Sequence, residues 1–209
     1  MRAAFTTRQG GVSEAPWDSF NLGLHVNDAP QNVAANRARL KSLLSLPSEP
    51  VWLSQVHGVD VFDLDKAGDL LAPPTADAAI AHERGSVCTI MVADCLPVLF
   101  ASRDGSRIGA AHAGWRGLAA GVLEKTVAAL GVPGPQLSAW LGPAIAREHF
   151  EVGDEVRAAF VAHDAAAESA FAENSRGKWQ ADIVALARRR LEAVGVMEVS
   201  GGQWCTYTD

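Results

Sequence analysis

Three short segments of this 209-residue sequence carry residue types that can do chemistry, each at the end of an apolar stretch. They are Gln55–Gly58 with His57, Ala93–Pro97 with Asp94 and Cys95, and Ala111–Gly117 with His112. Two imidazoles and one thiolate can hold a zinc ion and leave its fourth position open. Zinc held in this way lowers the pKa of a water molecule and polarises a leaving group. The segments therefore predict a metal site, although their wide spacing fits no local finger motif and also suits a buried cysteine between two strand-end histidines.

Three further polar residues accompany these segments. Arg8 precedes a Gly-Gly pair, and Arg116 follows shortly after His112. Because an arginine side chain binds phosphate or carboxylate with two parallel hydrogen bonds, both are candidate anion ligands, and Arg8 is also readily explained as a salt-bridged surface residue. Asn21 lies in a loop, where its amide either orients a substrate or caps a turn, the turn being the commoner use. These residues extend the predicted site from a metal to a substrate.

The elements that must position these residues follow from hydrophobic periodicity and turn residues. Apolar and β-branched runs predict strands over Ala3–Thr7, Val51–Val56, Val59–Leu64, Val87–Val92, Val98–Ala101, Arg107–Ala111, Leu137–Leu141 and Met197–Gly201. Apolar residues at helical spacing predict helices that begin at an Asp28 cap, at about Leu118 (ending at Leu130), near Gly153, and at Asp182 (ending at Val194). Strands and helices mix without strict alternation. The sequence therefore predicts one α+β layered domain over residues 1–209, with mixed β-sheets flanked by helices.

The composition restricts the class of protein. Hydrophobic residues make up 48% of the chain and charged residues 20%, which is a globular balance. No apolar run approaches the roughly 20 residues that cross a bilayer. A net charge of -6 argues against a nucleic-acid or anionic membrane partner. The cysteines are odd in number and the N-terminus has no apolar signal region, so we expect a reducing, cytoplasmic location.

Six motifs, in this order, resemble one family. They are TTRQGGVS from Thr6, NLGLHVND from Asn21, QVHG from Gln55, VADCLPVLF from Val92, AAHAGWRGLAAGVL from Ala110 and GPAIAREHFEVGDEV from Gly142. Together they are similar to the YfiH or laccase-domain family, whose members are described as multi-copper polyphenol oxidoreductase laccases and as purine nucleoside phosphorylases. An ordered set of motifs is far more specific than any one of them, so the buried-cysteine alternative loses most of its weight.

The resemblance implies roles for residues at matched positions. The positions where the family binds a transition metal, usually zinc and sometimes copper, are here His57, Cys95 and His112. The positions that line its pocket are here Arg8, Asn21 and Arg116. The family fold is α+β and similar to the catalytic domain of cytotoxic necrotizing factors. The activities that the resemblance implies are phosphorolysis of adenosine, inosine and methylthioadenosine, and deamination of adenosine.

Two departures from the family pattern stand out. Ala146 and Phe150 replace a glycine and a tyrosine that are usual in the sixth motif, which is a mild change. Members commonly continue after the Cys205–Tyr207 segment with an aromatic and arginine-rich stretch that this sequence does not contain. We therefore expect any pocket residue from that stretch to be missing.

The first hypothesis is a zinc-dependent purine nucleoside phosphorylase with an adenosine deaminase side activity. In it, Arg8 and Arg116 hold phosphate, and Asp94 acts as acid or base beside the metal. Its partners are a purine nucleoside and phosphate, and the chain is a monomer or a homodimer.

Three alternatives from other classes remain open. A copper-dependent phenol oxidase would use the same ligands with Met91 or Met197 added, but few histidines remain for the further coppers that reduction of oxygen needs. A metal-free hydrolase would use Cys95 as its nucleophile, in keeping with a link between family members and the editing of peptidoglycan precursors. A binding module would show no turnover at all.

Overall fold

The chain divides into two compact units in the computed structural model, which describes residues 2–68 and 70–209. The first unit spans Met1–Pro50 and the second unit spans Val51–Asp209. The single domain over residues 1–209 stays a prediction. Among the helices of the described residues, none is long and apolar enough to cross a membrane.

Helix α1 (Pro30–Leu44) is the main element of the first unit. The helix expected after Asp28 is confirmed, since α1 begins at Pro30 and ends before Pro47. Its N-cap is Ala29, however, and not Asp28. The Asp28 carboxylate instead accepts hydrogen bonds from the preceding loop, from Ser13 Oγ at 2.7 Å and from Asn21 Nδ2 at 2.9 Å.

The loop before α1 is held by one buried side chain of that helix. Asn36 Oδ1 accepts from the Val12 N–H, and Asn36 Nδ2 donates to Ser13 Oγ and to the carbonyl oxygen of Asn21. The strand predicted over Ala3–Thr7 is absent, because no described segment pairs with these residues. An apolar run has strand propensity, but it still needs a partner for its backbone hydrogen bonds.

A six-stranded mixed sheet forms the centre of the second unit. Its strand order is β1 (Val61–Asp63), β2 (Ala78–Ala81), β4 (Ile108–Ala113), β3 (Leu96–Ser102), β5 (Leu137–Leu141) and β9 (Glu198–Gly201). β1 pairs with β2, and β5 with β9, in parallel, whereas the central pairings are antiparallel. This mixture of directions, with helices packed on the sheet, confirms the predicted α+β class.

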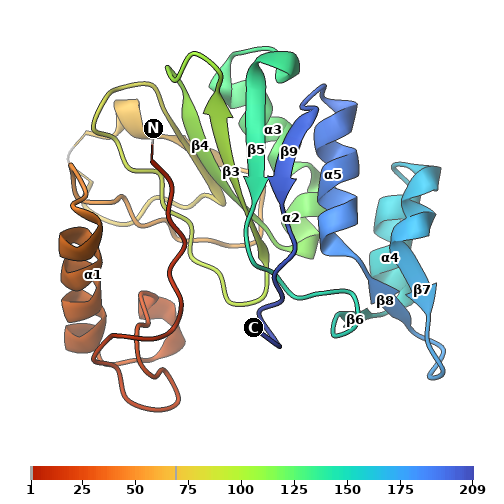
Figure 1. Cartoon of the computed structure of the whole chain (residues 1–209), viewed down its shortest axis with the longest axis horizontal. Coiled ribbons are helices and arrows are strands. Elements are labelled where there is room, and N and C mark those ends of the chain that lie inside the picture. The colour runs from red at the N-terminus through yellow and green to blue at the C-terminus, as the bar shows by residue number, and fades with distance from the viewer. Residues whose placement is uncertain (1, 69) are drawn as a thin grey trace. The chain divides into compact units, whose positions relative to one another are not determined.

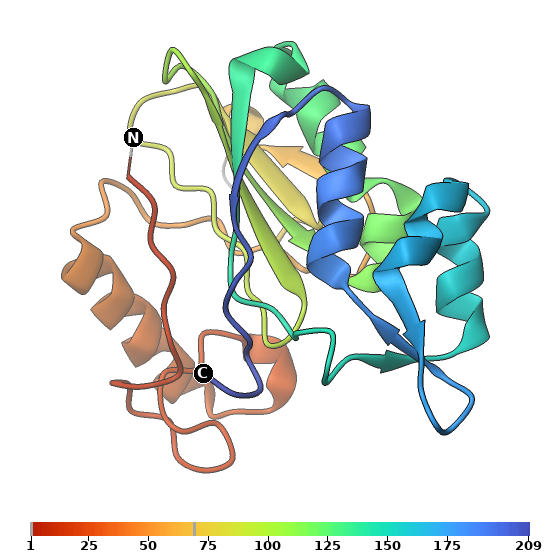
Figure 2. The same ribbon diagram turned by 45° about the vertical axis from the view of Figure 1, so that its right-hand side comes forward.

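Three helices of the second unit lie on the same side of this sheet (Figure 1; Figure 2). They are α2 (Trp115–Ala120), α3 (Val122–Leu130) and α5 (Ile183–Ala193). Leu118, Leu123 and Leu191 on these helices share one buried core with Val98 and Phe100 of β3. Burial of such side chains stabilises the fold by about 1.5–3 kcal/mol each, and it fixes the helices on the sheet.

A three-stranded antiparallel sheet packs against α4 (Asp154–Val161). Its order is β6 (Glu151–Val152), β8 (Trp179–Ala181) and β7 (Phe171–Glu173). The helix predicted near Gly153 is confirmed as α4, but the strands beside it are too short for periodicity to predict. Short 3-10 helices complete the described elements: η1 (Leu24–Val26), η2 (Leu64–Lys66), η3 (Gly134–Gln136) and η4 (Ala165–Ala170).

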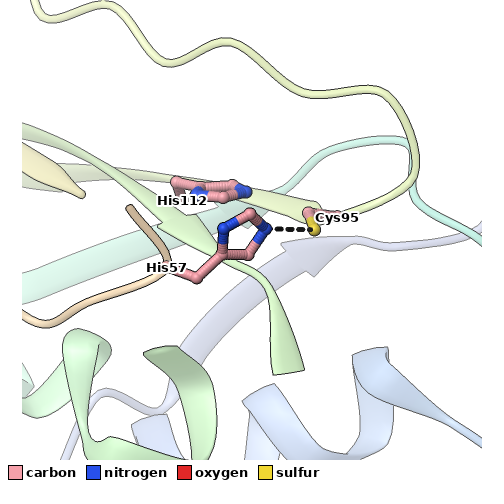
Figure 3. A group of neighbouring side chains, drawn as sticks. All are labelled: His57, Cys95 and His112. Atoms are coloured by element: carbon pink, nitrogen blue, oxygen red, sulfur yellow. Dashed lines mark hydrogen bonds between the residues drawn. The ribbon is translucent and has the colours of Figure 1, made fainter. Parts of the chain in front are cut away.

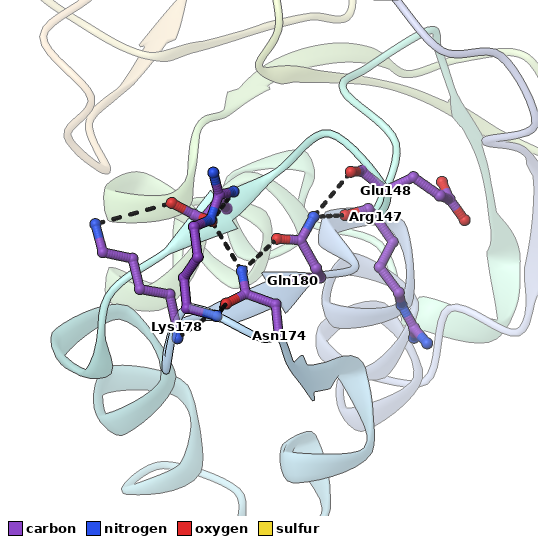
Figure 4. A network of polar contacts seen from close by, with 7 residues as sticks. Arg147, Glu148, Asn174, Lys178 and Gln180 are labelled. Carbon is purple, nitrogen blue, oxygen red and sulfur yellow. Dashed lines mark hydrogen bonds and ion pairs between the residues drawn. The ribbon is translucent and has the colours of Figure 1, made fainter.

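Polar side chains join this small sheet to the turn before β6. Asn174 Nδ2 donates to Glu151 and to Gln180, and Gln180 Nε2 donates to the carbonyl oxygens of Arg147 and Glu148 (Figure 4). These side-chain hydrogen bonds add to the backbone hydrogen bonds of the turn, in which the Phe150 N–H donates to the carbonyl oxygen of Ala146.

Two predicted strands of the second unit are absent. Val51–Val56 makes only an isolated bridge, and Val87–Val92 forms no strand. The side-chain amide of Gln55 binds the backbone of Met91 instead, donating to its carbonyl oxygen at 2.8 Å and accepting from its N–H at 2.9 Å. A side chain thus satisfies the backbone groups that a neighbouring strand would otherwise pair.

The remaining elements differ from the expectation mainly at their ends. The runs beginning at Val59, Val98, Arg107 and Met197 correspond to β1, β3, β4 and β9, and Leu137–Leu141 matches β5. The alanine-rich β2 is not predicted, because only one of its residues is β-branched. The helix expected from Leu118 to Leu130 starts earlier and is divided, since Gly121 has a φ of 101° between α2 and α3. The last helix is confirmed as α5, and Asp182 caps it.

Candidate metal centre

The register of β3 and β4 brings two of the predicted ligands together. Leu96 pairs with Ala113 and Pro97 pairs with His112. Because Cys95 directly precedes β3, it lies beside the last residues of β4. His112 is only 4% exposed, so the sheet presents a buried imidazole next to a strand-end thiol.

His57 reaches the same place from the loop before β1. Its backbone has a φ of 60°, a left-handed conformation that few residues other than glycine adopt. The N–H groups of Val56, His57 and Gly58 all donate to the Asp77 carboxylate, at 3.1, 2.9 and 2.7 Å. Asp77 is fully buried and directly precedes β2, so the loop that carries His57 is fixed to the sheet.

The side chains of His57, Cys95 and His112 converge (Figure 3). His57 Nε2 lies 3.8 Å from Cys95 Sγ, and the two imidazole rings meet edge to face with their centroids 4.7 Å apart. One ligand atom from each residue lies within 4.8 Å of the other two. Tetrahedral zinc, with bonds of about 2.3 Å to sulfur and about 2.0 Å to nitrogen, places those atoms about 3.5 Å apart. The donor set and its spacing therefore fit a zinc ion.

Two glycines permit this close approach. A Cβ atom on Gly114 would lie 2.8 Å from His57 Cδ2 and 2.9 Å from Cys95 Sγ, which is closer than van der Waals contact. A Cβ atom on Gly117 would lie 2.7 Å from the carbonyl oxygen of Gly58. The start of α2 can therefore lie directly against the ligand cluster only with glycine at these positions.

The charges around the cluster affect its two acidic groups differently. Burial raises the pKa of the Cys95 thiol, and the charges of Asp94 and Asp77 raise it further. An activated cysteine nucleophile has the opposite shift. Burial also acts to raise the pKa of Asp77, but hydrogen bonds from His112 and from three backbone N–H groups outweigh it and lower that pKa. The site thus combines a buried carboxylate with a thiol that a bound cation would deprotonate.

Asp94 and Arg116, two further predicted site residues, also belong to the second unit. Thr206 Oγ1 donates to Asp94 Oδ1 at 2.8 Å, and the Asp94 carbonyl oxygen accepts from the Ile145 N–H at 2.9 Å. The guanidinium of Arg116 lies over the ring of Trp115, 4.5 Å from its centroid. Segments distant in the sequence therefore anchor Asp94 beside Cys95, whereas Arg116 packs on its own helix.

Arg8 and Asn21 belong to the first unit. Arg8 Nε donates to the carbonyl oxygen of Asp18 at 2.8 Å, and its guanidinium pairs with the Asp18 carboxylate at 3.3 Å. Asn21 Oδ1 accepts from the Gly23 N–H at 2.9 Å, and its Nδ2 donates to Asp28. Arg8 therefore forms the surface salt bridge, and Asn21 the turn contact, that the sequence also allows for them. A role for either residue in substrate binding stays a prediction.

Sequence reasoning does not single out Asp77 or Thr206. A single aspartate before a short apolar run has many structural uses, and the contacts of Asp77 with the 56–58 loop and with His112 join segments that lie far apart in the sequence. The available signal is its place: Asp77 directly precedes an apolar run, just as Cys95 does.

A second group of potential ligands lies elsewhere in the second unit. Asp63, Asp65 and His82 offer ligand atoms within 4.8 Å of one another. Lys66 Nζ already pairs with Asp63 at 2.8 Å, and Asp65 lies 3.0 Å from His82 Nδ1. The carboxylates of this group therefore already have partners within the protein.

Comparison with known proteins identifies a family that matches this chain. The family model described as multi-copper polyphenol oxidoreductase laccase matches residues 2–209. A relative from Pseudomonas aeruginosa, named purine nucleoside phosphorylase, is 56% identical over 210 residues that cover 100% of this chain and 84% of the relative. The purine nucleoside phosphorylase YfiH of Escherichia coli is 53% identical over 209 residues, covering 100% of this chain and 85% of the relative.

Solved structures show the same fold. A crystal structure of a Neisseria meningitidis protein superimposes with a TM-score of 0.91 at 46% identity, covering 96% of this chain and 81% of that one. The crystal structure of a Bacillus licheniformis protein named YfiH has a TM-score of 0.87 at 28% identity, covering 97% and 81%. The expected similarity to YfiH proteins is therefore confirmed at the level of the fold.

Proposed function

Since this chain belongs to the multi-copper polyphenol oxidoreductase laccase family, we propose that it is a metal-dependent purine nucleoside phosphorylase acting on adenosine, inosine and methylthioadenosine. The observation that carries the proposal is the convergence of His57, Cys95 and His112 in a chain 56% identical to a relative named for that activity. An adenosine deaminase side activity at the same site is part of the proposal. A cytoplasmic location also belongs to it, supported by three cysteines that form no disulfide.

His57, Cys95 and His112 would hold the metal, and we propose zinc in preference to copper. Bound zinc supplies a Lewis acid that stabilises developing negative charge. The chain's own residues would do the rest. In phosphorolysis a phosphate oxygen bonds to C1′ of the ribose while the C1′–N9 bond breaks and its electron pair leaves with the purine. Asp94, oriented by Thr206, is proposed to hold the proton that the departing base takes up.

The test is release of free base from adenosine and from inosine, with and without phosphate, by protein whose metal content has been measured. We expect base and ribose 1-phosphate in equal amounts, only with phosphate and only with metal bound. Release without phosphate would indicate a hydrolase, and no release from zinc-loaded protein would contradict the proposal. Inosine formed from adenosine without phosphate measures the proposed deaminase activity separately.

Arg8 and Arg116 are the proposed phosphate ligands. Arg8→Ala is expected to raise the KM for phosphate by about 10- to 100-fold and to change the KM for nucleoside much less, because a hydrogen bond to a charged group contributes about 1.5–3 kcal/mol. The exposed Arg39 of α1 provides the matched control, since it lies outside the family motifs. Equal effects on both KM values would show that Arg8 does not hold phosphate. The same comparison applies to Arg116→Ala.

Two alternatives are covered by further arms of the same assay. A multi-copper oxidase needs several clustered histidines, and among the described residues only the His57–Cys95–His112 group contains more than one. The rate of phenol oxidation by copper-loaded protein is compared with the rate of nucleoside phosphorolysis by zinc-loaded protein. A higher rate of phenol oxidation would favour the oxidase. A thiol hydrolase would instead remain active without metal and lose activity on alkylation of Cys95.

A further inference from the structure

One carboxylate contacts both histidines of the proposed metal site. Asp77 Oδ1 accepts from the His57 N–H at 2.9 Å and lies 2.8 Å from His112 Nδ1. Asp77 Oδ2 accepts from the N–H groups of Val56 and Gly58. The backbone of Asp77 is fixed as well, because its carbonyl oxygen accepts from the His112 N–H at 2.7 Å. Asp77 therefore joins the loop before β1 to the end of β4.

The contacts with the loop hold His57 in an unfavourable conformation. A left-handed backbone is disfavoured for a residue that carries a Cβ atom, and it persists where surrounding contacts impose it. Three successive N–H groups that converge on one buried carboxylate impose it here. Removing that acceptor would release the contacts that keep φ of 60° at His57.

The contact with His112 selects one form of its imidazole ring. An ionised carboxylate only accepts hydrogen bonds, so Nδ1 of His112 must carry a proton to bind Asp77. In the neutral ring the other nitrogen, Nε2, then carries the lone pair. That is the nitrogen through which His112 would bind a metal, and a carboxylate behind a histidine ligand is a common way to fix its tautomer and orientation.

We propose that Asp77 is a positioning residue that sets both histidine ligands before any metal binds. The proposal rests on the metal site of the proposed function. It also accounts for the buried charge: a divalent cation with one Cys95 thiolate leaves one positive charge, which the Asp77 carboxylate offsets. The Asp77 side chain thus fixes the backbone conformation of His57, selects the tautomer of His112 and offsets the charge of the metal site.

The first experiment leaves Asp77 in place and observes the wild-type protein. The ring nitrogens of His112 are observed in a long-range proton–nitrogen NMR spectrum of the metal-free protein, with His112→Gln used to assign the signals. We expect the Nδ1–H tautomer. An Nε2–H tautomer would overturn the proposal whether or not the protein binds zinc.

The second experiment measures zinc affinity and uses Asp77→Asn, which keeps the shape of the side chain but gives it a donor. We expect the zinc dissociation constant, measured by competition with a chromogenic chelator, to rise about 10- to 100-fold. His112 should also lose its uniform Nδ1–H signal. Asp60→Asn is the matched control, because Asp60 is exposed and contacts Asp77 through its carbonyl oxygen, which the substitution leaves in place.

The outcomes separate this inference from the proposed function. Wild-type protein that binds zinc, with Asp77→Asn binding it equally well and keeping the Nδ1–H signal, would overturn the role of Asp77 and leave the metal site intact. Wild-type protein that binds no zinc would contradict the metal site, while the tautomer of His112 would still decide whether Asp77 sets the ring. A lower melting temperature with unchanged zinc affinity would show a merely structural role. If Asp77→Asn does not fold, Asp77→Glu and the wild-type spectrum give the decision.

Discussion

Replacing Cys95 by serine is expected to remove bound metal and turnover together while the protein stays folded. A serine hydroxyl is a far poorer zinc ligand than a thiolate, and two imidazoles alone do not make a tight site. The loss in zinc affinity should exceed the roughly 100-fold effect of losing an outer contact to a ligand. Turnover should fall with the metal content, since the proposed reaction depends on it.

The fold should tolerate this change because serine is nearly the same size and Cys95 lies just ahead of β3, only partly buried. Metal per chain, measured by elemental analysis after gel filtration, and the melting temperature of the metal-free protein give the two readouts. Stoichiometric metal on a folded Cys95→Ser protein would contradict the ligand assignment.

Cys88→Ser is the matched control for this experiment. Burial, with a smaller contribution from Asp65, raises the pKa of the Cys88 thiol to about 12. Among the described residues, Cys88 belongs to neither group of potential metal ligands. Cys88 packs with a separate small apolar cluster around Leu53 and Ala79. We expect full metal content and turnover in this variant. A loss equal to that of Cys95→Ser would show that the effect is on the fold.

The helices could be predicted, and the three candidate ligands could be named, because their signals are local. Pro30 and Asp182 mark helix starts through backbone and capping chemistry that acts within one turn. Each ligand belongs to a motif that is only a few residues long. Spacing along the chain does not predict that the ligands meet in space, because their meeting depends on the register that places Cys95 beside the end of β4.

The errors arise where hydrogen bonds join distant residues. Val87–Val92 has the composition of a strand, yet the backbone of Met91 binds the side chain of Gln55 instead of a neighbouring strand. The role of Asp77 could not be predicted for the same reason. Its hydrogen-bond partners belong to two other segments, and the residues next to Asp77 in the sequence do not indicate them. Local propensity describes what a segment can form, and tertiary contacts decide which partner it takes.

Gly114 shows how the backbone itself makes room for the site, and Gly114→Ala is the second variant for which we expect a large effect. The residue has φ of -64° and ψ of 155°, which alanine adopts without strain. Any effect must therefore come from the added methyl group. Its carbon would lie 2.8 Å from the ring of His57 and 2.9 Å from the sulfur of Cys95, and both side chains would have to move by several tenths of an ångström or more.

A displacement of about 1 Å at a reacting centre lowers activity by about 100-fold, so the displacement here corresponds to a loss of about 10- to 100-fold in kcat/KM. We expect that loss for Gly114→Ala, together with weaker zinc retention, because the methyl group separates two ligands that must share one ion. Gly68→Ala is the control, since among the described residues beyond its chain neighbours no atom lies within 4 Å of the position of its Cβ. Normal zinc content and normal turnover in Gly114→Ala would contradict this expectation. They would mean that His57 and Cys95 do not lie against the start of α2 as closely as the structure shows, and that other donors hold the metal.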